Sequence, residues 1–171
     1  MGTLSIEDDC LTPERYAYLT YSGPDPWGVF KKITDSLKPF FHISTSSTNN
    51  DRLNWDISGD PITFYSLWWV KKKMSGISLA KITIKVQGEV SKTTNMGKFT
   101  LQLYGDLYTE FSAPSILLKS AWLLYSYLFY NKARQAYITE CQGLIYNFRN
   151  EIKKHYNLDV TSVPERGVAF G

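Results

Sequence analysis

Two neighbouring stretches in which apolar and polar residues alternate strictly constrain the fold more than any other feature of the sequence. Residues 81–90 read KITIKVQGEV, residues 97–111 read GKFTLQLYGDLYTEF, and the polar segment 91–96 joins them. Successive side chains of a strand point to opposite faces, so this alternation predicts two antiparallel strands with one core face and one wet face. The short polar connection predicts that the two strands form a hairpin.

Three further segments have the composition of strands. Residues 15–21 are rich in Tyr, Leu and Thr, and residues 53–57 alternate apolar with polar side chains, which predicts a half-buried strand. Residues 62–73 (ITFYSLWWVKKK) place large apolar side chains on both faces, which predicts a strand covered on both sides. We therefore expect an antiparallel sheet of about five to seven strands.

One helix is predicted in the N-terminal half of the chain. Asp25 followed by Pro26 is a typical N-cap and first-turn pair, and Pro39 is expected to end or kink the helix. Apolar side chains follow the cap at the 3.6-residue period of a helix, which predicts one buried face. The residues at this spacing are Trp27, Phe30, Ile33, Thr34 and Leu37.

A second, much longer helix is predicted at the C-terminus. Ser112 or Ser115 can cap its start, and no residue that ends a helix follows until Asn157. Its second half, residues 132–156, is amphipathic, as a surface helix should be. Its first half, residues 116–130, is apolar nearly all round.

The length of this helix is a problem for a compact chain. About 42 residues would span roughly 63 Å, whereas a compact chain of this size has a radius of gyration of about 15 Å. We therefore expect the helix either to break near Asn131 or Gly143, or to protrude and meet another chain. Lys119 and the short apolar run argue against a transmembrane segment, which needs about 20 apolar residues.

These elements predict an α+β fold in which the long C-terminal helix packs on one face of the sheet. A chain of 171 residues has the usual size of one domain, which we assign to residues 14–157. Residues 1–13 are acidic and end at a proline, and residues 158–171 contain a Pro-Glu-Arg-Gly run. Both segments are expected to be flexible tails.

The order of elements over roughly residues 15–156 resembles the helix-grip arrangement of the Bet v 1 and START-like lipid-binding proteins. The resemblance concerns the order of strands and helices, and no sequence motif accompanies it. It implies an apolar cavity between a curved sheet and the last helix. The residues predicted to line such a cavity, or an interface, are Trp68, Phe99, Leu103, Leu118, Trp122, Tyr125 and Phe129.

The charge balance does not favour a polyanionic partner. Nineteen basic residues against 16 acidic residues give a net charge of +3, so nucleic acid is not an expected partner. The run 71–73 (KKK) follows Trp68 and Trp69, and such a cluster could hold phosphates and stack bases. The interpretation we favour is that these lysines keep the end of a hairpin soluble.

Catalytic and metal-binding patterns are missing from the sequence. Two histidines and two distant cysteines, Cys10 and Cys141, do not suggest a zinc site, and no nucleophile motif or phosphate loop is present. Asp106 and Glu110 would lie about 13 Å apart on one strand, too far for a catalytic pair and more typical of a solvated face. We expect a non-enzymatic protein without a cofactor.

The location is expected to be cytoplasmic. The N-terminal sequence has no basic segment followed by an apolar one, as a signal peptide would. Two cysteines far apart in the chain favour reduced thiols over a disulfide framework.

The apolar segment 116–130 is the best candidate for function. It could be a buried core helix, a subunit interface, or one wall of an apolar cavity, and burial is the usual fate of a helix that is apolar all round. The leading hypothesis is a binding module that holds an apolar small molecule or a protein partner between the sheet and the C-terminal helix. The alternative is a homo-oligomer that uses residues 116–130 as its interface.

Overall fold

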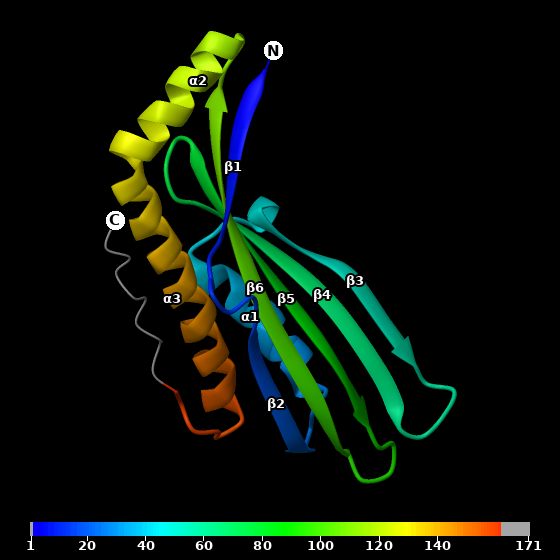
Figure 1. The fold of residues 1–171 in the computed structure, drawn as a ribbon. Coiled ribbons are helices and arrows are strands. Elements are labelled where there is room, and N and C mark those ends of the chain that lie inside the picture. The colour runs from blue at the N-terminus through cyan, green and yellow to red at the C-terminus, as the bar shows by residue number, and fades with distance from the viewer. Residues whose placement is uncertain (1, 162–171) are drawn as a thin grey trace.

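The protein, in a computed structural model that describes residues 2–161, combines one antiparallel sheet with helices on a single face (Figure 1). Within these residues the sheet has six strands, in the order β1-β6-β5-β4-β3, with β2 also paired to β6. The strands are β1 (Thr3–Asp9), β2 (Ala17–Pro24), β3 (Thr48–Asp56), β4 (Ile62–Lys73), β5 (Ser78–Val90) and β6 (Met96–Ser112). The predicted α+β class and antiparallel sheet are confirmed.

Strand β6 organises the sheet. It forms the predicted hairpin with β5, in which Ile84 faces Leu103. Along its other edge, the first half of β6 pairs with β2 and the second half with β1. Because β5 begins opposite Thr109, the last three residues of β6 have only β1 as a paired strand, although the Glu110 amide also bonds to the Ile77 carbonyl just before β5. The sheet is therefore wide at the level of β2 and narrow at the end of β6.

The N-terminal segment corrects the prediction of a flexible tail over residues 1–13. Thr3–Asp9 form β1, which pairs with β6 from Ser112 to Asp106. Leu4 and Ile6 alternate with more exposed residues, which is a strand pattern that the acidic composition of the segment obscured. Of the predicted C-terminal tail, residues 162–171 lie outside the described residues.

Helix α1 (Gly28–Phe41) covers one face of β4 and β5. The helix has Trp27 at its N-cap position, two residues after the predicted N-cap Asp25, because Asp25 and Pro26 belong to the preceding turn. A carboxylate oxygen of Asp25 still accepts a hydrogen bond from the Gly28 amide at 3.2 Å. Pro39 lies inside the last turn and does not end the helix. The Phe30 ring packs against Phe64, with centroids 5.4 Å apart. The buried residues of α1 are Val29, Ile33, Leu37 and Phe41.

Helix α3 (Asn131–His155) covers the same face beside α1. Its buried apolar residues meet the inner residues of β5 and β6 in one continuous core. At Gly105 of β6 the helix approaches closely, since a Cβ atom there would lie 2.9 Å from the Cδ1 atom of Ile145. Side chains therefore fill the space between helix and sheet at this point. The apolar residues that α3 buries are Ile138, Cys141, Ile145, Tyr146, Phe148 and Ile152.

The long C-terminal helix is continuous but changes geometry. Helix α2 (Ile116–Tyr125) leads into a π-helical segment (Ser126–Tyr130) and then directly into α3. The prediction of an irregularity near Asn131 is close to the observed one, whereas Gly143 lies within α3 and breaks nothing. In Figure 1 the two ends of this helix lean in different directions, with α2 beside the ends of β1 and β6. Irregular π turns commonly bend helices.

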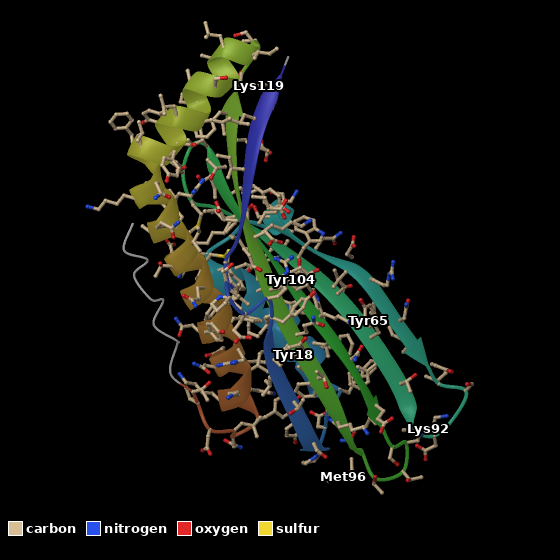
Figure 2. All side chains as sticks on the ribbon, in the orientation of Figure 1. Tyr18, Tyr65, Lys92, Met96, Tyr104 and Lys119 are labelled. Atoms are coloured by element: carbon tan, nitrogen blue, oxygen red, sulfur yellow. A yellow bond between two sulfur atoms is a disulfide. The ribbon has the colours of Figure 1, made fainter. Side chains whose placement is uncertain are left out.

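The second face of the sheet carries no helix among residues 2–161, which corrects the prediction that β4 is covered on both sides. Phe64 and Trp68 point into the core, but Trp69 on the other face is only half-buried. Tyr18, Tyr65 and Tyr104 also lie on this second face, which we call the open face (labelled in Figure 2).

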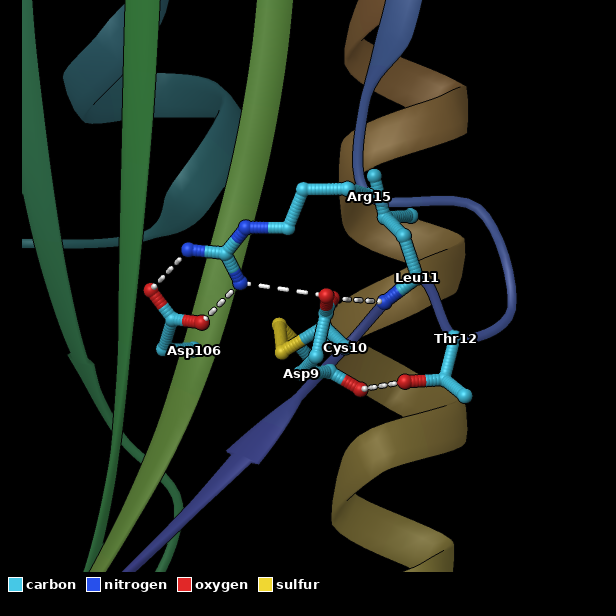
Figure 3. The surroundings of a disulfide bond; sticks show 7 residues. Asp9, Cys10, Leu11, Thr12, Arg15 and Asp106 are labelled. Carbon is cyan, nitrogen blue, oxygen red and sulfur yellow. Dashed lines mark hydrogen bonds and ion pairs between the residues drawn. A yellow bond between two sulfur atoms is a disulfide. The ribbon is translucent and has the colours of Figure 1, made fainter.

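A disulfide corrects the prediction of reduced thiols. Cys10 and Cys141 are joined by an S–S bond, with their Cα atoms 5.7 Å apart (Figure 3). Cys10 directly follows β1, and pairing of β1 with β6 brings it beneath α3. Both cysteines are fully buried. The sequence separation of 131 residues concealed a proximity that only the sheet pairing creates.

Candidate interaction surface

Segment 116–130 exposes most of its large apolar side chains to solvent. No residue of α2 is buried, although its composition is the most apolar of any helix in the described chain. Leu117 and Phe129 are 83% and 72% exposed. The sequence interpretation of this segment as a core helix is therefore wrong. The exposed large apolar residues, which together we call the apolar helix surface, are Ile116, Leu117, Leu118, Leu123, Leu124, Tyr125, Tyr127, Leu128 and Phe129.

A narrow inner stripe attaches the segment to the sheet. The Trp122 ring stacks on Phe111 of β6, with centroids 4.8 Å apart and planes 20° apart. The Trp122 Nε1 group donates a hydrogen bond to the Ser112 carbonyl at 3.1 Å. One turn further on, Ser126 is buried, and the Tyr130 hydroxyl lies 2.9 Å from the Ser78 hydroxyl. These contacts hold one side of the helix and leave the others uncovered.

The local sequence determines where this helix begins, and the sheet beneath it determines how much of the helix is exposed to solvent. The Ser115 hydroxyl accepts a hydrogen bond from the Leu118 amide at 3.2 Å, which confirms one of the two predicted N-caps. Beneath α2, the sheet consists only of β1 and the end of β6. Two strands cannot cover a helix that is apolar all round, so its outer side chains remain in water.

The amount of exposed apolar surface is unusual. At roughly 150–200 Å² for a large side chain, the exposed fractions correspond to about 900 Å². The largest apolar patch on a typical monomer is about 300–600 Å², and larger ones mark interaction sites. Lys119 is the one charged residue in segment 116–130, and its side chain lies close to Gly2 at the start of β1. The apolar helix surface is therefore almost uncharged.

The predicted site residues do not form a single site. Trp68, Phe99 and Leu103 are at most 3% exposed and belong to the core between the sheet and the helices. The other four residues lie together on α2 and the π-helical segment, where Trp122 faces Phe111 and three are exposed. These three are Leu118, Tyr125 and Phe129.

A hollow that sequence reasoning missed lies near the start of α1, where β3 and β4 are joined. It has a volume of about 410 Å³, and its lining includes Trp27, Trp55 and Ile57. The two indole rings lie 6.1 Å apart. Trp55 and Ile57 were predicted to be half-buried, but both side chains are exposed. Their alternation does not reveal that β3 is an edge strand, where Trp27 at the start of α1 covers only part of Trp55.

The open face contains one charged cluster with clear geometry. The Arg15 guanidinium donates a hydrogen bond to the Asp106 carboxylate at 2.6 Å and forms an ion pair with Asp9 at 3.1 Å (Figure 3). These hydrogen bonds, chiefly the one to Asp106, raise the pKa of the Arg15 guanidinium above its ordinary value. Asp106 was expected on a solvated face with Glu110, but it is only 7% exposed.

Other kinds of site have little support in the described part of the chain. Residues 2–161 contain no group of three His, Cys, Asp or Glu side chains arranged to hold a metal ion. Every helix among them falls short of the length or apolarity needed to cross a bilayer.

Comparisons with known proteins do not identify the chain. No protein-family model matches it, and neither does any curated protein. Among solved structures, it is similar to the crystal structure of the Mll3558 protein from Rhizobium loti, with 8% sequence identity. The match covers 82% of this chain and 96% of that chain, with a TM-score of 0.15. A score this low supports no argument about fold or function.

Proposed function

We propose that this protein is a non-enzymatic module that associates with a second copy of itself through the apolar helix surface. The observation that carries the proposal is the exposure of nine large apolar side chains on one short, almost uncharged helical segment. Leaving such a surface in water is unfavourable, and burial of its area would stabilise a complex.

The outer side of α2 has the pattern of a helix-packing seam. Leu117, Leu124 and Leu128 recur at the spacing of one helix face, and all three are exposed. Between them lie the small residues Ser120 and Ala121, which are also exposed. Small residues flanked by leucines let two helices approach closely and interlock. Two copies of α2 packed antiparallel would bury this seam about a two-fold axis.

A second copy fits the surface better than a membrane does. A stable interface buries about 800 Å² on each partner, and the whole apolar helix surface exposes an area of this order. An amphipathic helix that lies on a membrane carries Lys and Arg on its polar face. Here the face opposite the seam packs on β6 through Trp122, and the segment has a single lysine, Lys119.

Sedimentation equilibrium of the full chain tests the proposal. We expect the wild-type protein to be a dimer at micromolar concentration. The double variant Leu117→Glu/Leu124→Glu places like charges in the seam and should be monomeric with an unchanged circular dichroism spectrum, since both residues are exposed. Ile57→Glu is the matched control, because Ile57 is 62% exposed but far from α2 along the sheet. This variant should remain a dimer.

Two results would refute self-association. One is a wild-type protein that stays monomeric up to the highest soluble concentration. The other is a monomer that floats with lipid vesicles and loses this binding in Leu117→Glu/Leu124→Glu, which would assign the surface to a membrane.

The hypothesis of an apolar small molecule held between the sheet and the C-terminal helix has less support. The packing of Ile145 over Gly105 fills the space beneath α3 at that point. A ligand of this kind would fit better in the hollow beside Trp27 and Trp55.

A further inference from the structure

On the open face, one short side chain of β5 lies between two aromatic side chains, one from β4 and one from β6. Trp69, Thr83 and Tyr104 are direct cross-strand partners and therefore lie in one row on one face. Neighbouring strands are about 4.8 Å apart, so the two rings start roughly 10 Å from each other. Thr83 is only 7% exposed, so the larger side chains around it form the surface at this point.

Lysines surround this row of three residues. Lys81 and Lys85 lie two residues before and after Thr83 on β5, on the same face and roughly 7 Å from it along the strand. Lys71 is the direct cross-strand partner of Lys81. Two like charges placed opposite each other destabilise a sheet, so the Lys71–Lys81 pair does not serve the stability of the fold.

No acidic side chain within residues 2–161 forms an ion pair with these three lysines. Asp106 is the cross-strand partner of Lys81, but its carboxylate is bound by Arg15 at 2.6 Å. The Lys71 ammonium instead lies 5.1 Å from the centre of the Trp69 ring. Arg15 lies 5.3 Å from the centre of the Tyr104 ring, and its one positive charge is shared by Asp106 and Asp9. The open face thus presents cations and aromatic rings together, beside one partly compensated pair of carboxylates.

We propose that the open face binds single-stranded nucleic acid, with bases stacked on Trp69 and Tyr104 and phosphates held by Lys71, Lys81 and Lys85. Stacking platforms interleaved with cations are the means by which proteins bind single strands without sequence preference. A duplex would not serve, because its paired bases do not expose their faces to a flat sheet. The positive charge that would attract the phosphates is confined to the open face, so the net charge of +3 for the whole chain does not reveal it.

This binding site is independent of self-association. The apolar helix surface belongs to a helix that packs on Phe111, whose side chain is on the inner face of β6. Trp69 and Tyr104 point away from that face, as their alternation with the buried Trp68 and Leu103 requires. A dimer formed through α2 would therefore leave both open faces accessible.

Fluorescence anisotropy with a labelled oligothymidylate tests the proposal on the full chain. We expect saturable binding that weakens with salt, with a log–log slope of about −2 if three phosphates are contacted. The double variant Lys81→Gln/Lys85→Gln should weaken binding about tenfold at low salt and reduce the slope by about 1.4. Trp69→Ala should weaken binding by roughly tenfold, through loss of stacking.

The control is Lys31→Gln, which removes one positive charge from the exposed surface of α1 on the other side of the sheet. Its affinity should stay within twofold of the wild type, and all variants should keep the wild-type circular dichroism spectrum. Absence of saturable binding at low salt would overturn the proposal. So would equal weakening by Lys31→Gln, tighter binding of a duplex of the same sequence, or equal affinity for polyglutamate, which would indicate a general attraction of anions.

Discussion

The two halves of the C-terminal helix differ in how much of their apolar surface the rest of the chain covers. Helix α3 lies over the wide part of the sheet beside α1, and eight of its residues are buried. Helix α2 lies over the narrow end formed by β1 and the last residues of β6, and none of its residues is buried. The difference teaches that the width of the sheet beneath a helix decides its burial, whatever its own hydrophobicity.

The largest expected effect on stability is found by replacing one phenylalanine with alanine in each half of the helix and comparing the two variants. Phe148 is fully buried against Phe40 and Phe41, whereas Phe129 is 72% exposed. Phe148→Ala should lower the free energy of unfolding by about 3–5 kcal/mol, because it removes a core ring and leaves a cavity. Phe129→Ala should change it by less than about 0.5 kcal/mol.

Urea denaturation at low protein concentration, where association is weak, measures both values. Equal losses in the two variants would contradict the comparison, because they would mean that α2 is covered within the monomer.

Removal of the disulfide should have the next largest effect. The Cys10–Cys141 bond ties the end of β1 to α3 and makes no link to α2. The double variant Cys10→Ala/Cys141→Ala should lose about 2–5 kcal/mol of stability, since a crosslink between distant residues restricts the unfolded chain. Thermal or urea unfolding of oxidised wild type and variant gives the difference. Two reactive thiols per chain in the native, non-reduced protein would rule out the bond.

The smallest effect concerns the start of α2. Ser115→Ala removes the hydroxyl that accepts from the Leu118 amide, at a cost of about 1 kcal/mol to the helix. Because α2 is weakly attached, hydrogen exchange should accelerate in residues 116–122 while the amides of α3 keep their wild-type rates. Ser120→Ala is the control, since its hydroxyl bonds only within the helix, to Ile116. Unchanged exchange throughout α2 in Ser115→Ala would show that the cap is dispensable.

Much of the fold followed from local patterns, and the failures have physical causes. The alternation in residues 81–90 and 97–111 predicted the β5–β6 hairpin, and Asp25 predicted the neighbourhood where α1 starts. The tail prediction missed β1, because acidic residues outweighed the alternation of Leu4 and Ile6. The alternating residues of β3 look half-buried in sequence, yet Trp55 is 54% exposed because β3 is an edge strand.

The candidate surfaces were predictable only in part. Segment 116–130 could be recognised as unusually apolar, but no local signal showed that it would be exposed. The cluster of Trp69 and Lys71 was visible as a run of letters. Its neighbours Thr83 and Tyr104 come from other strands, so the row that they form depends on the register of the sheet.

The sequence by itself determined most of the strands and the helical segments, with β1 as the exception, since period, capping residues and turn residues act over a few positions along the chain. It also determined that residues 116–130 carry more apolar surface than an ordinary surface helix. Only the tertiary structure decided that β1 and β2 share one edge of β6, that Cys10 meets Cys141, and that the apolar segment lies beyond the wide part of the sheet. The reason is that burial depends on which distant strands lie beneath a segment, and strand pairing is a property of the whole chain.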